Sequence, residues 1–484
     1  MHGLEHCPVN NKRRIPTPVK LYVLALIIRL IPVLLTSNLA IGLDDMFQYD
    51  MLARSLAEGN GFRWYSAADL DLVRSYVDID LVVGDFDPNG ILASFRAPGY
   101  PAFLSVIYSL TSLSTRFFIA RIIQTFVGAG LVPLAYFISK KLLPAHPRSA
   151  FIAGIALAFY PMLAIYPLAL ATENLFIPLV YAGILLLLKA SEKQQLSLFG
   201  IAGAVLGLAT LTRSVVFAFV GLAALWIWWV SRNWRAVAVY LISLLIVVSP
   251  WVIRNTLLHD RFTFVENSLG YNLHMGYHPL SQGTFQYGIS LELFPYIDDG
   301  VRNEIGVEAG LGFIRENPER IPQLMLNRLS FFMGLEKRGL SYFYSNGFFG
   351  SIPPATLLGI FLIFTLPFAI ISSLAIIGFG FNRWNKGNVL MALFISAYTA
   401  PHILLLSEPR FHLAIVPAIA IYAGYAWSRR TEINSLAISN RKLATVLFIA
   451  LILLWLNWAW ELNRDADLLR TLFGPDGYRA GFSY

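Results

Sequence analysis

Two neighbouring carboxylates, Asp44 and Asp45, follow the first long apolar stretch of the chain, in the sequence LDDMFQYDMLARSLAEGNGF. Ionisable side chains are costly to place at the edge of a membrane, so they are candidates for a functional site. Aspartate also caps helices, because its side chain accepts hydrogen bonds from the unpaired N–H groups of the first turn. Two acids are more than one cap requires, which favours a chemical role for the pair.

Other charged and polar side chains lie where further apolar stretches end, on the same side of the predicted membrane. They are Glu173, Arg213, Arg254, His402, Glu408, Arg410 and His412, and Arg96 in the turn FRAPGYP could face them. A proton or ion path would need charges strung through the spans, whose interiors are nearly free of them. The gathering therefore predicts a catalytic or binding crevice at the outer leaflet.

These residues also have structural interpretations. Glu173 could stabilise a helix start through the helix dipole, the arginines could anchor helix ends at the interface, and Arg96 could be an exposed turn residue. Histidines in such positions are more often structural than metal-binding. Arg410 has a stronger case for binding an anion, because Glu408 and the helix-stopping Pro409 flank it.

The composition of the chain excludes an ordinary soluble domain. Of its 484 residues, 56% are hydrophobic and 14% are charged, which indicates a polytopic membrane protein. The net charge of +8 comes from basic loops between apolar spans, so we expect no nucleic-acid partner. Cys7 is the single cysteine, which excludes an intramolecular disulfide and a metal site built on thiolates.

About eleven stretches are long and apolar enough to cross a bilayer, at about 17–25 residues each. The predicted spans are 21–40, 117–139, 149–167, 173–190, 196–212, 214–230, 236–254, 356–380, 388–406, 411–427 and 442–460. We interpret the first as a retained anchor and not as a cleaved signal peptide. The apolar segment 102–113 is too short to cross and is expected to lie in the interface as a helix.

The loops that join these spans alternate between basic and non-basic, so the positive-inside rule places the basic set in the cytoplasm. The opposite side holds two long loops, 41–116 and 256–355. The second contains the turn-rich sequence NSLGYNLHMGYHPLSQGTF and a helix-like stretch over 305–332. We find no internal repeat, which weakens an inverted-repeat transporter interpretation.

The predicted organisation has five parts. They are a cytoplasmic tail (1–20), an N-terminal transmembrane module (21–255, with juxtamembrane helices in the loop 41–116), a large outer loop (256–355), C-terminal transmembrane helices (356–460) and an outer tail (461–484). The fold class is all-α and polytopic. The expected location is a bacterial inner membrane, with the N-terminus in the cytoplasm and the active site on the periplasmic side.

No cofactor is predicted with certainty. Asp45, its neighbour and Glu173 could bind a divalent cation, although no spacing demands one. His259, His274 and His278 show no metal-ligand spacing among themselves, which argues against a metal site built from them.

A set of short motifs carries a family resemblance. They are the acid pair with Tyr49, APGYP (97–101), YPLALATEN (166–174), TLTRS (210–214), PWVIRN (250–255) with GYNLHMGYHP after it, and EPRFHLAIVP (408–417). Their order and spacing resemble the GT-C superfamily of polyprenyl-phosphate-dependent glycosyltransferases, over about residues 20–425. The similarity is to bacterial relatives of protein O-mannosyltransferases and lipid A aminoarabinose transferases.

The resemblance implies roles for particular residues. Asp45 matches the catalytic acidic position and Glu173 the second acidic motif, with Asp44 in support. Many relatives have Asp-Glu where this chain has Asp44–Asp45, so the identity of the base stays open between the two. The candidates for binding the donor phosphate are Arg410, Arg254 and Arg213, and those for binding substrate are Tyr49, Arg96, Tyr100, Glu408 and His412.

The predicted function is that of an inverting glycosyltransferase with an aspartate as general base. Its partners would be a polyprenyl-phosphate sugar, a cell-envelope acceptor and the lipid bilayer. Arginines would bind the phosphate and stabilise it as leaving group, while the aspartate deprotonates the incoming hydroxyl. The alternatives are a transporter or flippase of an amphipathic lipid-linked substrate, or an enzyme like an O-antigen ligase. The sequence names neither the sugar nor the acceptor.

Overall fold

The computed structural model describes residues 15–42, 44–76, 86–347 and 350–481. Within these residues the regular structure is helical, apart from a pair of two-residue antiparallel strands, β1 (Arg63–Trp64) and β2 (Ile91–Leu92). The predicted all-α class is therefore confirmed.

Eight helical segments in the described residues are long and apolar enough to cross a membrane, or nine if one bent pair is counted as a span. The eight are α1 (Thr17–Leu35), α5 with α6 (Arg116–Ala129, Leu131–Leu142), α9 (Glu173–Lys193), η2 with α11 (Ser214–Val216, Phe217–Ser231), α12 (Trp234–Leu258), α18 (Pro354–Phe381), α19 (Lys386–Leu404) and α22 (Arg441–Arg464). The bent pair joins α7 (Pro147–Ala158) to α8 and η1 (Pro161–Ile165, Tyr166–Leu168) at 55°. The chain is a multi-pass integral membrane protein.

By length and apolar composition, fewer segments of the described residues qualify than the eleven predicted spans. The expected spans 196–212 and 411–427 correspond to α10 (Leu196–Thr212), of 17 residues, and α20 (Val416–Ser428), of 13 residues. At 1.5 Å per residue a 13-residue helix is only about 20 Å long, well short of the apolar layer. Every residue from Val416 to Ala426 is buried, because α20 packs between α7 and α18. Its apolar composition serves this packing, which local sequence cannot distinguish from lipid contact.

The remaining helices do not span. They are α2 (Asp45–Ala57), α3 (Ala67–Arg74), α4 (Gly99–Tyr108), α13 (Leu269–Tyr277), α14 (Tyr287–Leu291), α15 (Asp299–Glu316), η3 (Pro318–Arg320), α16 (Ile321–Phe332), α17 (Arg338–Phe343), η4 (Pro409–Ala414), α21 (Ile433–Ser439), α23 (Ala466–Leu472) and η5 (Gly477–Arg479). The stretch that looked turn-rich contains α13. The helix-like stretch is two helices, α15 and α16, separated at Pro318.

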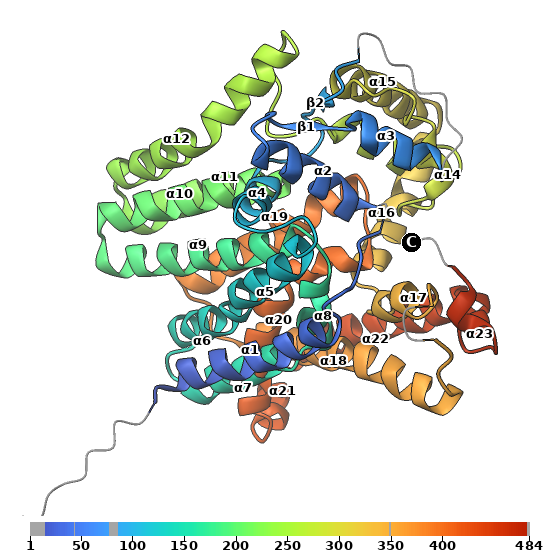
Figure 1. Ribbon diagram of the computed structural model, residues 1–484. Coiled ribbons are helices and arrows are strands. Elements are labelled where there is room, and N and C mark those ends of the chain that lie inside the picture. Colours follow the sequence, from blue (N-terminus) through green and yellow to red (C-terminus); the bar gives the residue numbers. More distant parts are fainter. Residues whose placement is uncertain (1–14, 43, 77–85, 348–349, 482–484) are drawn as a thin grey trace, which may run out of the picture.

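The two long loops pack together, although about 200 residues separate them in the sequence. Figure 1 shows α2, α3 and the paired strands β1 and β2 beside α14 and α15 at the upper right of the molecule. The buried carboxylate of Asp299 accepts hydrogen bonds from the N–H groups of Ser94 (2.6 Å) and Phe95 (2.8 Å). Tyr271 packs edge-on against Phe95 as well, with 5.4 Å between ring centroids. The first loop is thereby held by the second.

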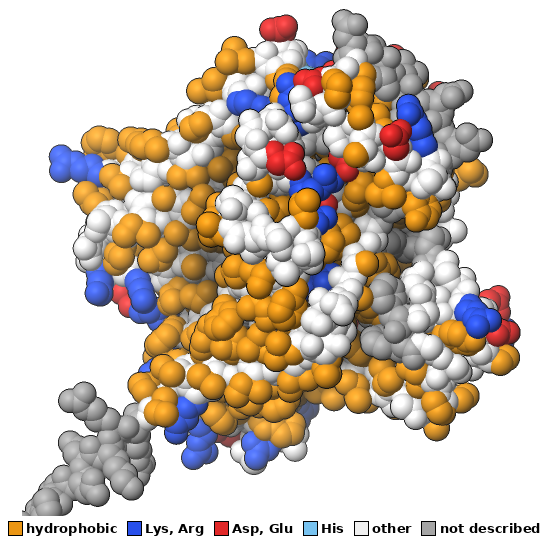
Figure 2. All heavy atoms as spheres, in the orientation of Figure 1, with side chains coloured by type: hydrophobic (Ala, Val, Ile, Leu, Met, Phe, Trp, Pro, Cys, Tyr) orange, Lys and Arg blue, Asp and Glu red, His pale blue; other side chains and the backbone are white. Residues whose placement is uncertain are grey.

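Hydrophobic side chains cover much of the molecular surface. On the face in Figure 2 they spread over α1, α5 and α6, while lysines and arginines lie at the left and lower edges and again in the centre and near the top, and carboxylates lie mainly toward the top and right. Exposed leucines, isoleucines and tryptophans on α12 and α22 continue this apolar surface. Such a surface is expected of helices that face lipid.

Two buried polar side chains on α5 hold the chain where other helices break. Arg121 donates from Nη1 to the carbonyl of Leu39 (2.5 Å) and from Nε to that of Leu168 (2.8 Å). Gln124, one turn along, donates to the carbonyls of Pro167 (2.6 Å) and Ala169 (2.9 Å). Carbonyls freed near a membrane need such donors because no water replaces the lost helical bond. These contacts fix the stretches that lead into α2 and α9.

Candidate functional site

Asp45, the first residue of α2, lies between two arginines from distant parts of the chain. Its Oδ1 accepts a hydrogen bond from Nη2 of Arg96, and its Oδ2 accepts one from Nη2 of Arg410 at 3.0 Å. Burial raises the pKa of Asp45, but the two guanidinium groups outweigh it and hold the pKa well below its usual value. The side chain is 31% exposed, so this ionised carboxylate can meet a substrate.

Asp44 has a different position from its neighbour. It is the N-cap of α2, and its Oδ1 accepts a hydrogen bond from the N–H of Met46 at 2.8 Å. The capping interpretation therefore applies to Asp44, while Asp45 points toward the arginines. A cap of this kind fixes the start of a helix, so Asp44 orients the residue that follows it.

Arg410 continues the cluster toward two more charged residues. Its Nε lies 2.8 Å from Oε2 of Glu408, and the same oxygen accepts a hydrogen bond from Nη1 of Arg338 at 2.6 Å. Pro409 starts the short helix η4, which turns Arg410 back toward Asp45. In its contacts with the described residues, Arg410 uses Nη2 and Nε, which leaves Nη1 for an anion.

A second arginine–carboxylate pair lies beside the first. Nη1 of Arg213 donates to Oε1 of Glu173 (2.5 Å) and contacts Oγ1 of Thr172 (3.2 Å). The ring of Phe411 lies 5.3 Å from the guanidinium of Arg213 and 5.6 Å from that of Arg410. Both arginines thus contact the same aromatic ring, which brings the two pairs together. Glu173 is only 5% exposed, much less than Asp45.

Tyr49 borders both pairs, one turn along α2 from Asp45. The guanidinium of Arg96 lies 5.4 Å from its ring centroid. Burial raises the pKa of Tyr49 to about 12, so the phenol keeps its proton and can donate a hydrogen bond. The structure thus brings together Asp45, Arg96, Glu173, Arg213, Glu408, Arg410 and Tyr49 of the predicted site residues.

Three other predicted residues take structural positions. The hydroxyl of the fully buried Tyr100 donates to Oε1 of Gln124 at 2.9 Å. His412 is completely buried, with Nε2 3.0 Å from Oε1 of Glu336 and its ring stacked on Phe368. Arg254 donates to the carbonyl of Ala93 and lies over Trp251, outside the contacts that join Asp45 to its arginines. The predicted substrate or phosphate contacts of these three residues gain no support from their positions.

Two other members of the cluster are not among the residues predicted from the sequence. Arg338 comes from the large loop, and Gln48 accepts a hydrogen bond from Nε of Arg96 at 2.8 Å. Gln48 lies three residues after Asp45 on the same face of α2, so helical periodicity could have identified it. Arg338 could be found only from the folded chain.

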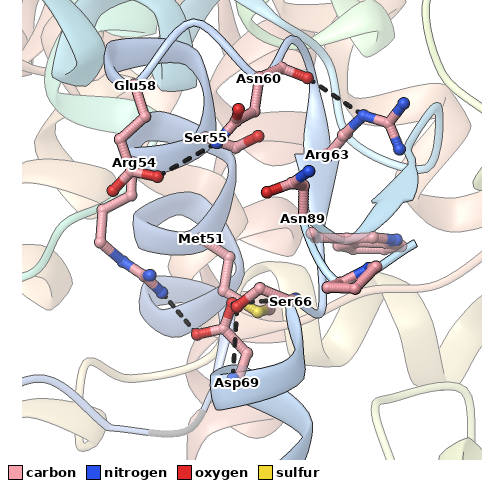
Figure 3. A pocket seen from close by; sticks show the side chains of 11 residues that line it. Met51, Arg54, Ser55, Glu58, Asn60, Arg63, Ser66, Asp69 and Asn89 are labelled. Atoms are coloured by element: carbon pink, nitrogen blue, oxygen red, sulfur yellow. Dashed lines mark hydrogen bonds and ion pairs between the residues drawn. The ribbon is translucent and has the colours of Figure 1, made fainter. Parts of the chain in front are cut away.

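A small polar pocket lies farther along α2 (Figure 3). Its volume is about 80 Å³, and its lining includes Arg54, Ser55, Arg63 and Asp69. Arg54 donates to Asp69 at 2.6 Å across this pocket. Sites for small ligands usually measure about 300–1,000 Å³, so this pocket is too small for a sugar. It lies where α2, α3 and the strand pair β1–β2 pack together.

Metal binding at the predicted acids would compete with arginine. Asp45 and Glu173 both accept hydrogen bonds from guanidinium groups, which take the place that a divalent cation would occupy. Among the described residues, the side chains close enough to share a metal ion are instead His274, His278 and Glu292. Two of them, His274 and His278, are residues whose sequence spacing argues against a metal site.

Comparisons with known proteins agree with the predicted resemblance. Residues 96–253 match the family model described as dolichyl-phosphate-mannose-protein mannosyltransferase. No curated protein matches the chain.

Among solved structures, the fold is similar to the oligosaccharyltransferase AglB from Archaeoglobus fulgidus. The complex with an inhibitory peptide and a dolichol-phosphate matches with a TM-score of 0.50 at 15% identity, over 96% of this chain and 60% of that one. The form tethered to an acceptor peptide matches with a TM-score of 0.50 at 14% identity, over 96% and 59%. This chain thus spans about 60% of the length of the archaeal enzyme. A weaker likeness, with a TM-score of 0.40 at 12% identity over 87% and 79%, is to ArnT from Cupriavidus metallidurans bound to undecaprenyl phosphate.

Gly99 allows the turn that carries Arg96 to approach Arg213. A Cβ at Gly99 would lie 2.7 Å from Oγ1 of Thr212 and 2.9 Å from the carbonyl oxygen of Leu211. We therefore expect Gly99→Ala to lower the free energy of unfolding by about 1–3 kcal/mol, as overpacking does, measured by thermal or denaturant unfolding in detergent. Gly128→Ala is the control, because a Cβ there meets nothing within 4 Å. Equal stability of the two variants would contradict this explanation.

Proposed function

We propose that this chain, whose residues 96–253 match a mannosyltransferase family, is an integral membrane glycosyltransferase. It would move a sugar from a polyprenyl-phosphate donor to a hydroxyl of a cell-envelope acceptor, which is a lipid, a glycan or a protein. The observation that carries the proposal is the carboxylate of Asp45, held between Arg96 and Arg410 and open to substrate. The fold it shares with AglB supports a GT-C architecture.

The proposed reaction is a single displacement with inversion. Asp45 takes the proton of the acceptor hydroxyl, whose oxygen then forms a bond to the anomeric carbon of the sugar. The bond from that carbon to the phosphate oxygen breaks, and polyprenyl phosphate leaves with the electron pair. Arg410 and Arg213 would bind the phosphate and stabilise the charge that develops on it. One base opposite the leaving group is sufficient, unlike the two flanking carboxylates of a glycoside hydrolase.

Donor binding would also make Asp45 a stronger base. Without substrate, its two arginines keep its pKa low, which weakens it as a proton acceptor. A phosphate that binds Arg410 offsets positive charge near Asp45, and burial then raises the pKa. The base would therefore be activated only when the donor is present.

A transporter is the less favoured alternative. Two of the arginines inside the spans, Arg29 and Arg121, donate to backbone carbonyls where helices break. These two arginines supply hydrogen-bond donors to the free carbonyls and do not line a path for a substrate. The O-antigen ligase alternative gains no specific support, because the acid of the site comes from α2 and not from the large loop.

For the orientation, we infer that the basic loops face the cytoplasm and the site faces the periplasm of a bacterial inner membrane. The site draws on the module 21–255, on the loop 256–355 through Arg338, and on the C-terminal helices through Arg410.

Cysteine labelling in intact cells tests this orientation. In a Cys7→Ser background, an impermeant thiol reagent should modify Glu304→Cys, in the large loop, and should spare Lys386→Cys, at the start of α19. Both positions are exposed, so permeabilised cells, in which both should react, provide the control. Labelling of Lys386→Cys alone would indicate the opposite orientation in the membrane.

The two neighbouring aspartates provide a matched pair for testing the base. Asp45→Asn should lower the transfer rate by about 100- to 10,000-fold, the contribution typical of a general base. Asp44→Asn should stay within a few-fold of the wild type, because asparagine caps a helix as well as aspartate does. Both variants are assayed as purified protein with a panel of polyprenyl-phosphate sugars. Full activity of Asp45→Asn would end the assignment.

Arg410→Ala tests both phosphate binding and control of the base. Loss of a charge-assisted hydrogen bond of about 1.5–3 kcal/mol should raise the apparent KM for the donor about tenfold or more. The active form is the Asp45 carboxylate, which is lost as the pH falls through its pKa. Without Arg410 this pKa is higher, so the acidic limb of kcat/KM should move to higher pH. Arg74→Ala, at an exposed arginine of α3, should change neither quantity, and an unchanged Arg410→Ala would contradict the proposed role.

A further inference from the structure

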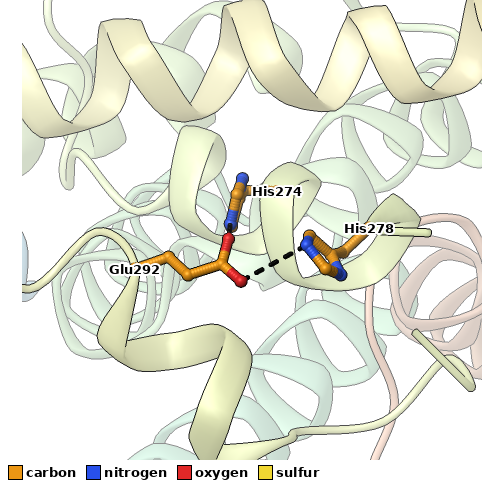
Figure 4. A group of neighbouring side chains, drawn as sticks. All are labelled: His274, His278 and Glu292. Atoms are coloured by element: carbon orange, nitrogen blue, oxygen red, sulfur yellow. Dashed lines mark hydrogen bonds and ion pairs between the residues drawn. The ribbon is translucent and has the colours of Figure 1, made fainter. Parts of the chain in front are cut away.

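The large outer loop contains three side chains suited to binding a metal ion, His274, His278 and Glu292. His274 lies in the last turn of α13, and His278, four residues later, directly follows the helix, so their side chains lie near each other. Glu292 follows α14 and directs its carboxylate between the two rings, as Figure 4 shows. Oε2 of Glu292 lies 3.0 Å from Nε2 of His274, and Oε1 lies 3.4 Å from Nε2 of His278.

These distances match those between the ligands of one zinc ion. Ligand atoms at about 2.0–2.1 Å from a tetrahedral zinc ion lie about 3.3 Å from one another. The candidate nitrogen and oxygen atoms all lie within 4.8 Å of each other. Two imidazoles and one carboxylate form a donor set that zinc accepts and that magnesium, which prefers oxygen, does not. A metal could therefore bind if the most distant of these ligand atoms approach one another by at most about 1.5 Å.

The surroundings hold the histidines in place and leave an entrance. The ring of Phe313, on α15, lies 5.6 Å from that of His274 and 5.3 Å from that of His278. The two histidine side chains are 7% and 12% exposed, whereas Glu292 is 48% exposed. An ion can thus enter from the Glu292 side, where water would complete its coordination.

One contact would change on binding. Nδ1 of His278 accepts a hydrogen bond from the N–H of Leu280 at 3.2 Å, so in the neutral ring Nε2 carries the proton. A metal at Nε2 moves that proton to Nδ1 and exchanges the Leu280 hydrogen bond for a metal bond.

The end of α13 that carries these histidines packs on the chain just before Glu408. The hydroxyl of Tyr277 donates to the carbonyl of Leu404 at 2.7 Å. Arg328 donates both to that carbonyl (2.7 Å) and to the carbonyl of Gly276 (2.6 Å). A Cβ at Gly276 would lie only 2.1 Å from the carbonyl oxygen of Leu405, so the backbones are in direct contact. A metal ion bound to His274, His278 and Glu292 would link the end of α13 to the residue after α14. It would thereby stabilise the contact between α13 and the chain before Glu408.

We propose that His274, His278 and Glu292 bind one zinc-like transition-metal ion that holds the large loop against the segment leading to Glu408 and Arg410. The ion has a structural role and takes no part in sugar transfer. The alternative is a hydrogen-bonded histidine–glutamate group that binds no metal.

Zinc binding by the purified full-length protein tests the proposal. In a Cys7→Ser background stripped with a chelator, isothermal titration should show one zinc ion bound per chain and no comparable binding of magnesium. Glu292→Gln should weaken zinc affinity by about tenfold or more, and His274→Ala with His278→Ala should abolish binding. Glu308→Gln, an exposed carboxylate on the neighbouring α15, should bind like the wild type.

Thermal unfolding gives a readout that is independent of activity. Zinc should raise the apparent Tm of the wild type and of Glu308→Gln, because a ligand that binds only the folded state stabilises it, and should leave Glu292→Gln nearly unchanged. Glu292 is half exposed, so this variant remains informative if the double histidine variant fails to fold. Absence of stoichiometric zinc binding would overturn the proposal. So would binding that is lost in Asp45→Asn but kept in Glu292→Gln, because the ion would then belong to the acidic site.

Discussion

The rest of the structure depends on how backbone carbonyls are satisfied where helices stop at the edge of the apolar layer. A carbonyl in this position has no water to replace its helical partner, so a buried side chain must donate to it. Arg121 and Gln124, one turn apart on α5, donate to the carbonyls of residues 39–40 and 167–169. These two stretches lead into α2 and α9, which begin at Asp45 and Glu173. Two side chains on one face of α5 therefore fix where α2 and α9 begin, and with them the positions of Asp45 and Glu173.

The charges of the site are placed in alternation, which makes their burial tolerable. A partly buried charge is stable only if it is paired and hydrogen-bonded, and here each carboxylate contacts at least one guanidinium. The pairs are nevertheless unequal. Glu173 is almost enclosed with Arg213, whereas Asp45 remains accessible between its two arginines. This asymmetry is the physical reason why we propose Asp45 for the proton transfer and a supporting role for Glu173.

The site extends beyond the segment that matches the mannosyltransferase family. Residues 96–253 supply Arg96, Glu173 and Arg213, but Asp45 precedes this segment and Arg410 follows it. The matched segment therefore holds part of the charge cluster, and the flanking helices complete it. The large loop adds Arg338 and rests on the backbone that carries Glu408. The pocket for sugar and acceptor would be shaped by this loop, whose packing sets what can approach Asp45.

Local sequence determined the class of the protein and indicated that a charge cluster lies at the ends of its spans. Composition and span length indicated a helical membrane protein, and the charges at the ends of the spans singled out the pair Asp44–Asp45 and Arg410, because apolar periodicity and charge placement are local properties. Only the folded chain separated Asp44, a helix cap, from its neighbour and added Arg338 to the site. It also showed that α20 is packed against other helices instead of lipid, and it placed Glu292 between two histidines. These features arise from packing between segments that are distant in the sequence, or from the conformation of a loop, and neither is encoded in a local pattern.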